Sequence, residues 1–141
     1  MVKPIVKDIE FLQQKSEKAE LNAEETKIVI RDLIDTANEY AESKSCVGLS
    51  AIQIGVPLRV CVVYNGQEFV PFVNPIIVGK HGNKYQAEEG CMSLDGTRIV
   101  ERYEKVTVMR RGSKGYIKET YKGFMAQIIQ HELYHFDGKL I

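Results

Sequence analysis

Hydrophobic residues recur with a helical spacing near both ends of the chain and with a strand-like spacing in between. In the segment 22–43, apolar residues return every three or four positions, which predicts a long helix. Asn22 stands three positions before Glu25, and this pair predicts a capping box at the start of that helix. The segment 124–138 contains no proline, and no glycine before Gly138, so it predicts a second helix that ends there.

The middle of the chain is rich in the β-branched and aromatic residues that favour strands. Residues 58–64 and 116–123 each predict one strand, and residues 96–112 predict two. Residues 70–78 include prolines, which sheets accept at their edges, so this segment predicts an edge strand. With one helix before the strands and one after them, residues 1–141 predict a single α+β domain whose helices cover the sheet.

Charge and composition exclude several classes of protein. The 19 basic and 19 acidic residues leave no net charge, so no overall field draws the protein to nucleic acid or to an anionic membrane. No apolar run is long enough to span a bilayer, and the first residues are too charged for a signal peptide, which predicts a cytoplasmic protein. The 3 cysteines are an odd number that argues against a disulfide framework and leaves metal binding or catalysis open.

The clearest chemical signal lies in the second predicted helix, where His131, Glu132 and His135 form the pattern H-E-x-x-H. Residues four apart lie on one face of a helix, so both imidazoles reach a single metal ion. Glu132, beside these ligands, is placed to contact water at the ion. Two solvated histidines beside an incidental glutamate are the alternative, and the helical context of the motif argues against it.

A catalytic metal site typically needs a third protein ligand in addition to two histidines. Few residues follow His135, and the downstream position where another histidine would stand is Ile141, so we expect the third ligand upstream. The upstream candidates are three thiols, one imidazole and various carboxylates: Cys46, Cys61, Cys91 and His81. Cys91 follows a flexible glycine and is favoured, but spacing alone leaves the choice open.

Three motifs extend this picture. Residues 46–53 match the pattern G-x-G-x-A-A-x-Q at most positions, residues 89–93 match E-G-C-x-S in full, and residues 130–135 match Q-H-E-x-D-H at all but one. In order and spread, over about two thirds of the chain, they resemble the peptide deformylase family. That family removes the formyl group from the N-terminal methionine of new bacterial and organellar proteins. The resemblance implies mostly antiparallel sheets packed around the C-terminal H-E-x-x-H helix, with a long N-terminal helix.

The resemblance also implies a role for each residue of these motifs. The metal, natively ferrous iron with Zn²⁺, Ni²⁺ or Co²⁺ as substitutes, would have three protein ligands: Cys91, His131 and His135. Glu132 would carry a proton from water to the departing amine. Gln53 and the backbone N–H of Met92 would stabilise the oxyanion.

The residues that the resemblance places along the substrate are the following: Val47, Gly48, Glu89, Gly90 and Gln127. Gly48 would let the peptide lie alongside the first motif as an added strand, and Glu89 would pair with Arg98 to brace the Cys91 loop. The expected partners are N-formylmethionyl peptides, with transient ribosome contact and without a membrane or nucleic-acid site. Docking through the long C-terminal extension of some deformylases is not expected, because the chain stops soon after the third motif.

Four of the positions that depart from the family's pattern bear on the site. Cys46 replaces a glycine, Ser50 an alanine and Tyr134 an aspartate, while Gln127 stands where the family presents an apolar residue to the methionine pocket. A second thiol near the metal could ligate it or oxidise, although a small buried packing residue is the favoured interpretation of Cys46. Because the groups assigned to bond breaking are intact, the departures at Cys46, Ser50 and Gln127 predict weaker substrate recognition before weaker chemistry.

Two alternatives remain beside deformylation. One is a divergent paralogue with weak activity or another N-acyl substrate, and the other is a non-catalytic binder. The intact Glu132 argues against the binder, since binding alone does not require it.

Overall fold

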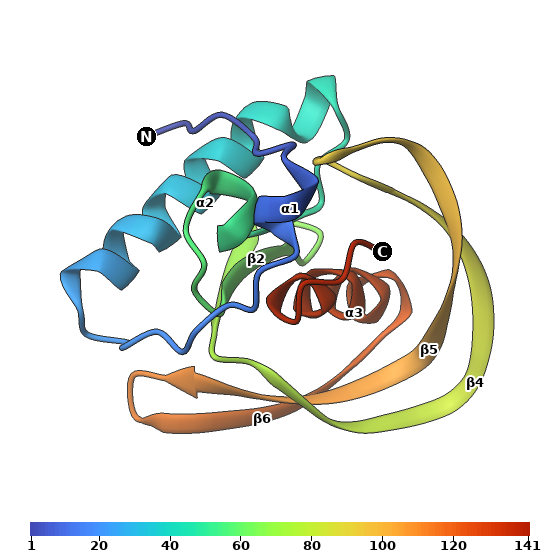
Figure 1. The fold of residues 1–141 in the computed structure, drawn as a ribbon. Coiled ribbons are helices and arrows are strands. Elements are labelled where there is room, and N and C mark those ends of the chain that lie inside the picture. The colour runs from blue at the N-terminus through green and yellow to red at the C-terminus, as the bar shows by residue number, and fades with distance from the viewer.

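Helix α3 (Gly123–Phe136) forms the centre of the molecule, and the computed structural model, which describes residues 1–141, places it between two antiparallel sheets (Figure 1). One sheet contains β4 (Ile76–Cys91), β5 (Leu94–Gly112) and β6 (Gly115–Lys122), in that order. β4 and β5 form a long hairpin that curls around α3, and β-bulges along it increase its twist.

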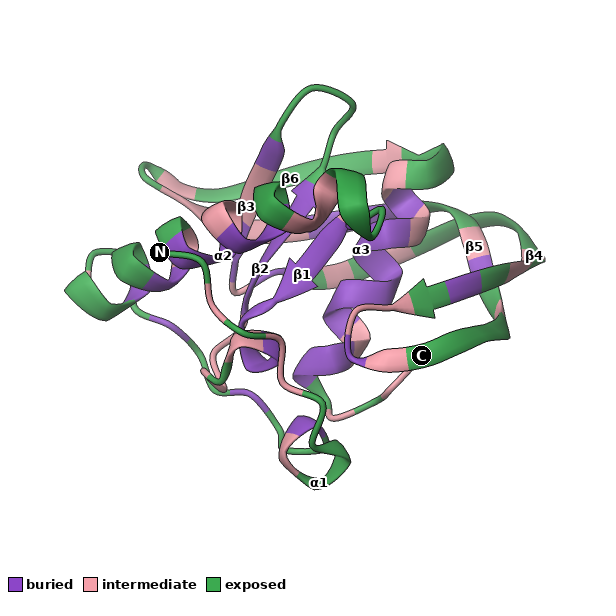
Figure 2. Cartoon of the chain, turned by 90° about the horizontal axis from the view of Figure 1, so that it is seen from above, coloured by how far each residue is buried: buried purple, intermediate pink, exposed green.

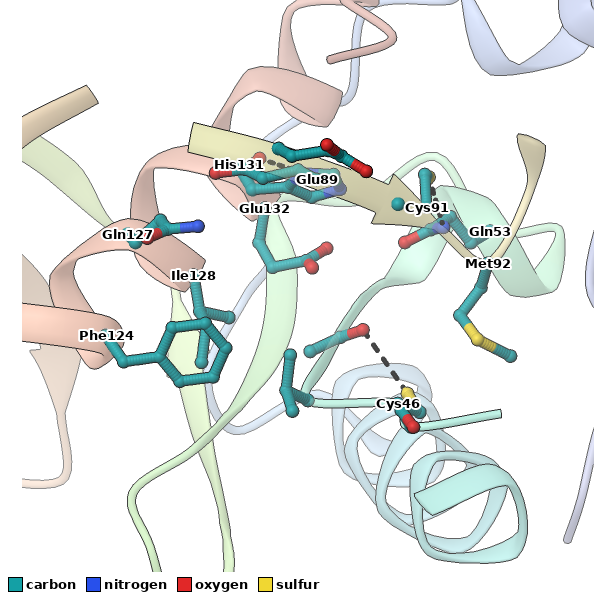
Figure 3. Close-up of a pocket in the computed structure, with 15 residues that line it drawn as sticks. Cys46, Gln53, Glu89, Cys91, Met92, Phe124, Gln127, Ile128, His131 and Glu132 are labelled. Atoms are coloured by element: carbon teal, nitrogen blue, oxygen red, sulfur yellow. Dashed lines mark hydrogen bonds and ion pairs between the residues drawn. The ribbon is translucent and has the colours of Figure 1, made fainter. Parts of the chain in front are cut away.

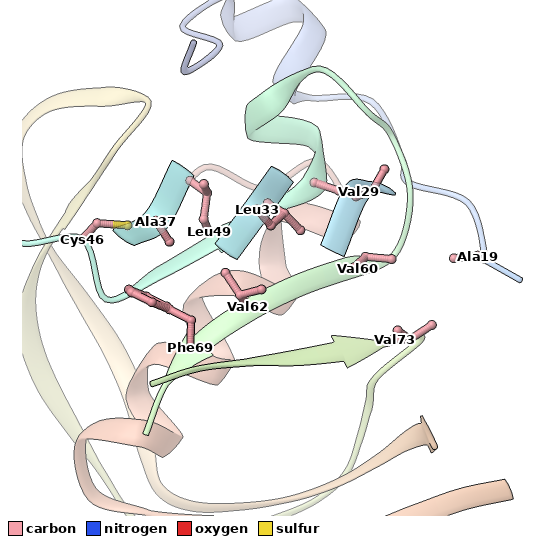
Figure 4. Packing of buried hydrophobic residues seen from close by; sticks show 11 residues of the cluster. Ala19, Val29, Leu33, Ala37, Cys46, Leu49, Val60, Val62, Phe69 and Val73 are labelled. Atoms are coloured by element: carbon pink, nitrogen blue, oxygen red, sulfur yellow. The ribbon is translucent and has the colours of Figure 1, made fainter. Parts of the chain in front are cut away.

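The other sheet pairs β1 (Gly48–Ser50) with β2 (Val60–Tyr64) and β2 with β3 (Phe69–Val73). Helix α2 (Glu24–Ser43) covers the face of this sheet that is turned away from α3 (Figure 4). The α+β arrangement with antiparallel sheets and a C-terminal helix was predicted from the sequence, and the structure has it.

Strand β2 is buried on both faces, which explains its unbroken apolar sequence. Val60 and Val62 belong to the core that α2 forms with the first sheet. Cys61 and Val63 alternate with them and belong to a second core, which includes the apolar residues of α3. All four side chains are fully buried, so β2 is the wall that the two cores share.

Helix α3 is enclosed on nearly every side, as the purple ribbon in Figure 2 shows. Its buried residues include four that are polar: Gln130, His131, Glu132 and His135. Gln130 exchanges hydrogen bonds with the backbone of Tyr103 on β5, at 2.9 and 3.0 Å, and so ties the helix to the second sheet. Burying a polar side chain costs free energy unless it has a partner. The burial of His131, Glu132 and His135 on one helix therefore indicates a functional site.

The structure corrects three local predictions. Helix α2 starts after Ala23, whose side chain makes no cap, so the capping box at Asn22 was wrong; acidic residues in the first turn suit the positive end of the helix instead. Residues 70–78 are not one strand, because Asn74 adopts a left-handed conformation (φ 49°) between β3 and β4. Residues 96–112 form one strand rather than two.

Two short elements complete the chain, the single turn α1 (Ile9–Leu12) and the 3₁₀ turn η1 (Ala51–Ile54). A capping box does occur, but at η1, where the Ser50 backbone N–H donates to the Gln53 side chain at 2.9 Å. None of the helices combines the length and the apolar character that crossing a membrane requires.

Candidate active site

The two imidazoles of the H-E-x-x-H motif lie one turn apart on α3, and the end of β4 brings Cys91 to them. The ligand atoms of Cys91, His131 and His135 all lie within 4.8 Å of one another. Two residues of the strand cover about 6.6 Å and four residues of the helix cover about 6 Å. Residues two apart on β4 can therefore face residues four apart on α3. Cys91 therefore meets His135 while Glu89, two residues earlier, meets His131.

The donor set fits a metal ion. The Cys91 Sγ and the His135 Nε2 are 3.6 Å apart. A tetrahedral ion with bonds of about 2.3 Å to sulfur and about 2.1 Å to nitrogen would separate these two atoms by about the same distance. Burial, together with the charges of His131 and Arg102, lowers the pKa of His135 to about 3, so this imidazole is neutral, as a ligand must be.

Glu89 fixes the orientation of His131. The His131 Nδ1 lies 2.9 Å from the Glu89 Oε1, and a carboxylate only accepts, so Nδ1 carries the proton and Nε2 is left for a metal. Burial would lower the pKa of His131, but its hydrogen bonds with Cys91 and Glu89 raise it to about 10. The site therefore favours a positive charge beside His131, which a metal cation would supply in place of the proton.

The partner of Glu89 is Arg102, not Arg98 as the family resemblance implied. Arg102 donates to both carboxylate oxygens of Glu89, at 2.7 and 3.0 Å, and is 1% exposed. Arg98 is the cross-strand neighbour of Glu89, yet it is exposed and donates to the Asp95 carbonyl. Only a paired guanidinium tolerates full burial, so the buried arginine takes the buried carboxylate.

These contacts set the charge on Glu89 and give Tyr134 a role. Burial would raise the pKa of Glu89, but the hydrogen bonds from His131 and Arg102 outweigh it and lower the pKa to about 2. The Arg102 guanidinium also lies 5.0 Å from the centre of the Tyr134 ring. Tyr134, one of the departures from the family's pattern, thus makes a cation–π contact with the residue that braces Glu89.

Glu132 is buried beside the first motif. Its Oε1 accepts from the Ser50 hydroxyl at 3.1 Å, and its Oε2 faces Gly48 so closely that a Cβ there would stand 2.7 Å away. Any side chain at position 48 would collide with the carboxylate, which explains the glycine. Burial raises the pKa of Glu132, while the charge of His131 and the Ser50 hydrogen bond lower it.

Gln53 closes the site from the side of η1. Its Nε2 lies 3.5 Å from the Cys91 Sγ and donates to the Ser93 hydroxyl at 3.2 Å. The capping box holds its other amide atom, so the side chain is fixed at both ends. Gln53 is 1% exposed and places a polar N–H group next to the thiol.

A cavity of about 250 Å³ opens onto these groups (Figure 3). The residues predicted from the sequence that line it are the following: Val47, Gly48, Gln53, Glu89, Gly90, Cys91, Met92, Gln127, His131 and Glu132. His135 lies deeper and is fully buried. Glu89 was expected to contact substrate, but its carboxylate is engaged by His131 and Arg102, so its contribution is to orient a ligand.

Cys46 lines the same cavity without joining the ligand group. Its thiol donates to the Gly48 carbonyl at 3.4 Å, as the dashed line in Figure 3 shows. Burial, reinforced by the charge of Glu132, raises the pKa of this thiol to about 12, so it stays protonated. A small packing residue, the favoured interpretation from the sequence, describes Cys46 better than a second metal ligand.

Sequence reasoning missed four polar contributors: Ser50 as the partner of Glu132, Ser93 as the partner of Gln53, Arg102, and Tyr85, which contacts Gln127. Ser50 had been expected to affect substrate recognition, but it does not line the cavity and contacts Glu132 instead. The alternation of β4 offered a signal for Tyr85, since it shares one face of the strand with Glu89 and Cys91.

Comparisons with known proteins find similarity to this chain over nearly its whole length. A family model described as polypeptide deformylase matches residues 2–141. The chain is 48% identical over 144 residues to a peptide deformylase of Clostridium beijerinckii, with 100% of each chain covered. It is 40% identical to that of Aquifex aeolicus over 137 residues, covering 92% of this chain and 78% of the other.

Several solved structures have a fold similar to that of this chain. The crystal structure of a peptide deformylase from Legionella pneumophila aligns with a TM-score of 0.86 and 36% identity, covering 99% of this chain and 83% of the other. That of Thermotoga maritima gives a TM-score of 0.89 and 29% identity, covering 99% and 95%. The likeness therefore extends to sequence, fold and length.

Proposed function

Because the chain belongs to the peptide deformylase family, whose members remove the formyl group from the N-terminal methionine of nascent peptides, we propose that its cavity hydrolyses N-formylmethionyl peptides. The observation that supports this most is the convergence of Cys91, His131 and His135 beside a buried Glu132. Water adds to the formyl carbon, the carbon–nitrogen bond breaks, and formate and a free amine leave.

Cys91, His131 and His135 would hold the metal, for which we propose ferrous iron, with zinc, nickel or cobalt as substitutes. When bound, the ion lowers the pKa of water to about 7 and so supplies a nucleophile at neutral pH. A half-buried thiolate beside iron is prone to oxidation, so the iron form should lose activity in air faster than the nickel form. Equal air stability of the two forms would argue against iron.

Glu132 is the proton carrier in this proposal. Its Oε1 is held by Ser50, while its Oε2 faces the cavity beside Gly48. The Oε2 accepts a proton from the attacking water and passes it to the departing nitrogen. Burial raises the pKa of this carboxyl, which brings it closer to the working pH and makes both transfers easier.

Gln53 and the backbone N–H of Met92 would donate to the oxygen that becomes negative during the reaction. Gln53 supports this role because its Nε2 lies 3.5 Å from the Cys91 Sγ and its carbonyl is anchored by the Ser50 backbone. Such donors stabilise the transition state most when they are positioned in advance, and removing one typically costs about 10²–10³-fold in kcat.

The substrate backbone would pair with the free edge of β1. This strand pairs only with β2, and the Val47 carbonyl accepts from the Tyr64 N–H at 2.9 Å. Because bonding alternates along an antiparallel strand, the polar groups of Gly48 point to the other side, where an extended peptide can lie. Val47, Gly48 and Gly90 would then flank the peptide.

Release of formate from formyl-Met-Ala-Ser by the iron-loaded protein under anaerobic conditions tests the proposal, with acetyl-Met-Ala-Ser as the comparison substrate. Formate release supports deformylation, and acetate release instead would indicate a paralogue with another N-acyl substrate. Metal binding without either product would indicate the non-catalytic binder. Since the substrate is a product of translation, we place the enzyme in the cytoplasm, in transient contact with the ribosome.

A further inference from the structure

We infer that this enzyme accepts N-formyl peptides whose first side chain carries a hydrogen-bond acceptor, methionine sulfoxide in particular, and that Gln127, oriented by Tyr85, recognises that acceptor. The inference rests on the proposed function, because it names a substrate class for the same cavity. It begins from a polar residue at a position where an apolar one would suit a methionine side chain better.

The amide of Gln127 has a defined orientation. The Tyr85 hydroxyl, on β4, donates to the Gln127 Oε1 at 3.0 Å. This bond uses the carbonyl end of the amide, so the Nε2 end lies on the side of the cavity that Gln127 lines (Figure 3). Nε2 makes no hydrogen bond within the protein, and its two donors remain available to a ligand.

The position of Gln127 suits the first side chain of a bound peptide. Gln127 stands one turn before His131 on α3, about 6 Å along the helix axis, and both residues line the cavity. A peptide whose formyl group lies at the metal ligands can therefore reach Gln127 with its first side chain, if that side chain extends along the helix. Phe124 and Ile128 line the same stretch and present apolar surface to the carbon atoms of that side chain.

The chemistry of the amide selects among possible side chains. The thioether sulfur of methionine is a weak acceptor, whereas the oxygen of a sulfoxide is a strong one. A wholly apolar pocket would leave the sulfoxide oxygen buried without a partner, which costs free energy. Here the Nε2 of Gln127 can donate a hydrogen bond to that oxygen. Oxidation of the substrate's methionine should therefore lower kcat/KM less in this enzyme than in one whose pocket has no donor.

The kinetic test compares kcat/KM for formyl-Met-Ala-Ser, its methionine sulfoxide analogue and its norleucine analogue, using the metal-loaded enzyme. Gln127→Leu keeps the size of the side chain and removes the donor, and Gln127→Glu replaces the donor by an acceptor. We expect the sulfoxide-to-methionine ratio to fall about 3- to 10-fold in both variants, the range of one hydrogen bond. Norleucine, which has no acceptor, should gain relative to the sulfoxide in Gln127→Leu.

Tyr85→Phe provides a second measure, because the amide loses its anchor while the donor remains. The sulfoxide-to-methionine ratio should fall in this variant by a smaller factor than in Gln127→Leu. Tyr116→Phe is the matched control: Tyr116 is 59% exposed and does not line the cavity, so the ratio should stay unchanged. An unchanged ratio in Gln127→Leu, or the same ratio in Gln127→Glu as in the parent, would overturn the inference.

A binding measurement separates this inference from the proposed function. Titration calorimetry on metal-loaded Glu132→Gln, with and without Gln127→Leu, gives the ratio of dissociation constants for the sulfoxide and methionine peptides without turnover. If the parent releases no formate but this ratio still depends on Gln127, the proposed function fails and the recognition stands. If formate is released and neither ratio depends on Gln127, the recognition fails alone.

Discussion

At the scale of single residues, Glu132 is buried and its side chain has a neutral hydrogen-bond partner. Its side chain bonds to the Ser50 hydroxyl rather than to an arginine or lysine. A cation in direct contact would hold the carboxyl ionised, and a wholly apolar pocket would hold it protonated. The neutral hydroxyl leaves the proton free to move in either direction, which a proton carrier needs.

Glu132→Gln should therefore keep the metal and lose the chemistry. The amide oxygen can still accept from Ser50, and the ligands on α3 are not altered. We expect kcat for formate release to fall by at least about 10²-fold, within the range for a positioned acid–base group. Metal content, measured by elemental analysis, serves as the control; activity within tenfold of the parent would contradict the assigned role.

Cys46 is expected to act on substrate binding through a single hydrogen bond. Its thiol already occupies the Gly48 carbonyl, one of the groups that faces the free edge of β1. An incoming peptide N–H competes with that thiol for the carbonyl oxygen, so Cys46→Ala should lower KM about 3- to 10-fold and change kcat little. Cys46→Ser keeps a donor and should leave KM close to the parent's or raise it. Steady-state kinetics on the two variants decide the matter, because equal KM values would exclude competition for the carbonyl.

The residue scale also shows what a sequence can and cannot reveal. The ligand pair His131 and His135 follows from helical spacing alone, since both lie on one element. The contact of Ser50 with Glu132 joins residues 82 positions apart, and no local pattern reports it. Arg98 was expected as the partner of Glu89 because the family resemblance implied it, whereas burial, which decided the outcome, depends on how the hairpin lies against α3.

At the scale of elements, the site depends on the match between β4 and α3. Arg102 on β5 holds Glu89 on β4, and Glu89 holds His131 on α3, so three elements meet through one carboxylate. The length of β5 could not be derived from its sequence. Gly96 lies inside the strand, near its start, with φ 72°, and the ladder continues beyond it, curved by bulges that disturb the alternation of side chains.

Arg102→Met should separate these three elements. It leaves the buried Glu89 carboxylate without its cation, a change that typically costs about 3–5 kcal/mol in the free energy of unfolding. Loss of the brace on His131 should also weaken metal affinity about 10- to 100-fold. Urea unfolding and a competitive chelator assay measure the two effects. Arg98→Met is the matched control, since Arg98 is exposed, and a stability loss as large as that of Arg102→Met would reverse the assignment.

At the scale of the whole molecule, the metal ligands join the end of the β4–β5 hairpin to the central helix. A metal that binds only the folded chain stabilises it by about 2.7 kcal/mol at a free concentration of 100 times its Kd. For a domain of this size, that corresponds to a rise in Tm of about 10 °C. All three cysteines are free, so no disulfide links these elements. Removal of the metal should therefore lower the free energy of unfolding of the whole domain.

Scanning calorimetry with nickel or with a chelator tests this coupling. The parent should lose about 10 °C in Tm when the metal is removed, and Cys91→Ala should show almost no dependence on metal. Cys61→Ala is the matched control, because this thiol is fully buried between β2 and α3 and is no ligand. It should unfold at a lower temperature yet keep the full metal-dependent increment. A full increment in Cys91→Ala would remove Cys91 from the ligand set.

The central position of α3 also affects when the protein can fold during its own synthesis. Both sheets precede α3 in the chain, and the core that β2 and β5 form with this helix is incomplete until the helix has been synthesised. The contact of Gln53 with Cys91 joins residues 38 positions apart and that of Ser50 with Glu132 joins residues 82 positions apart, and such non-local contacts form slowly. The site can therefore form only after synthesis has passed α3. The enzyme acts on the first residue of other emerging chains, but its own site forms only after α3 has emerged.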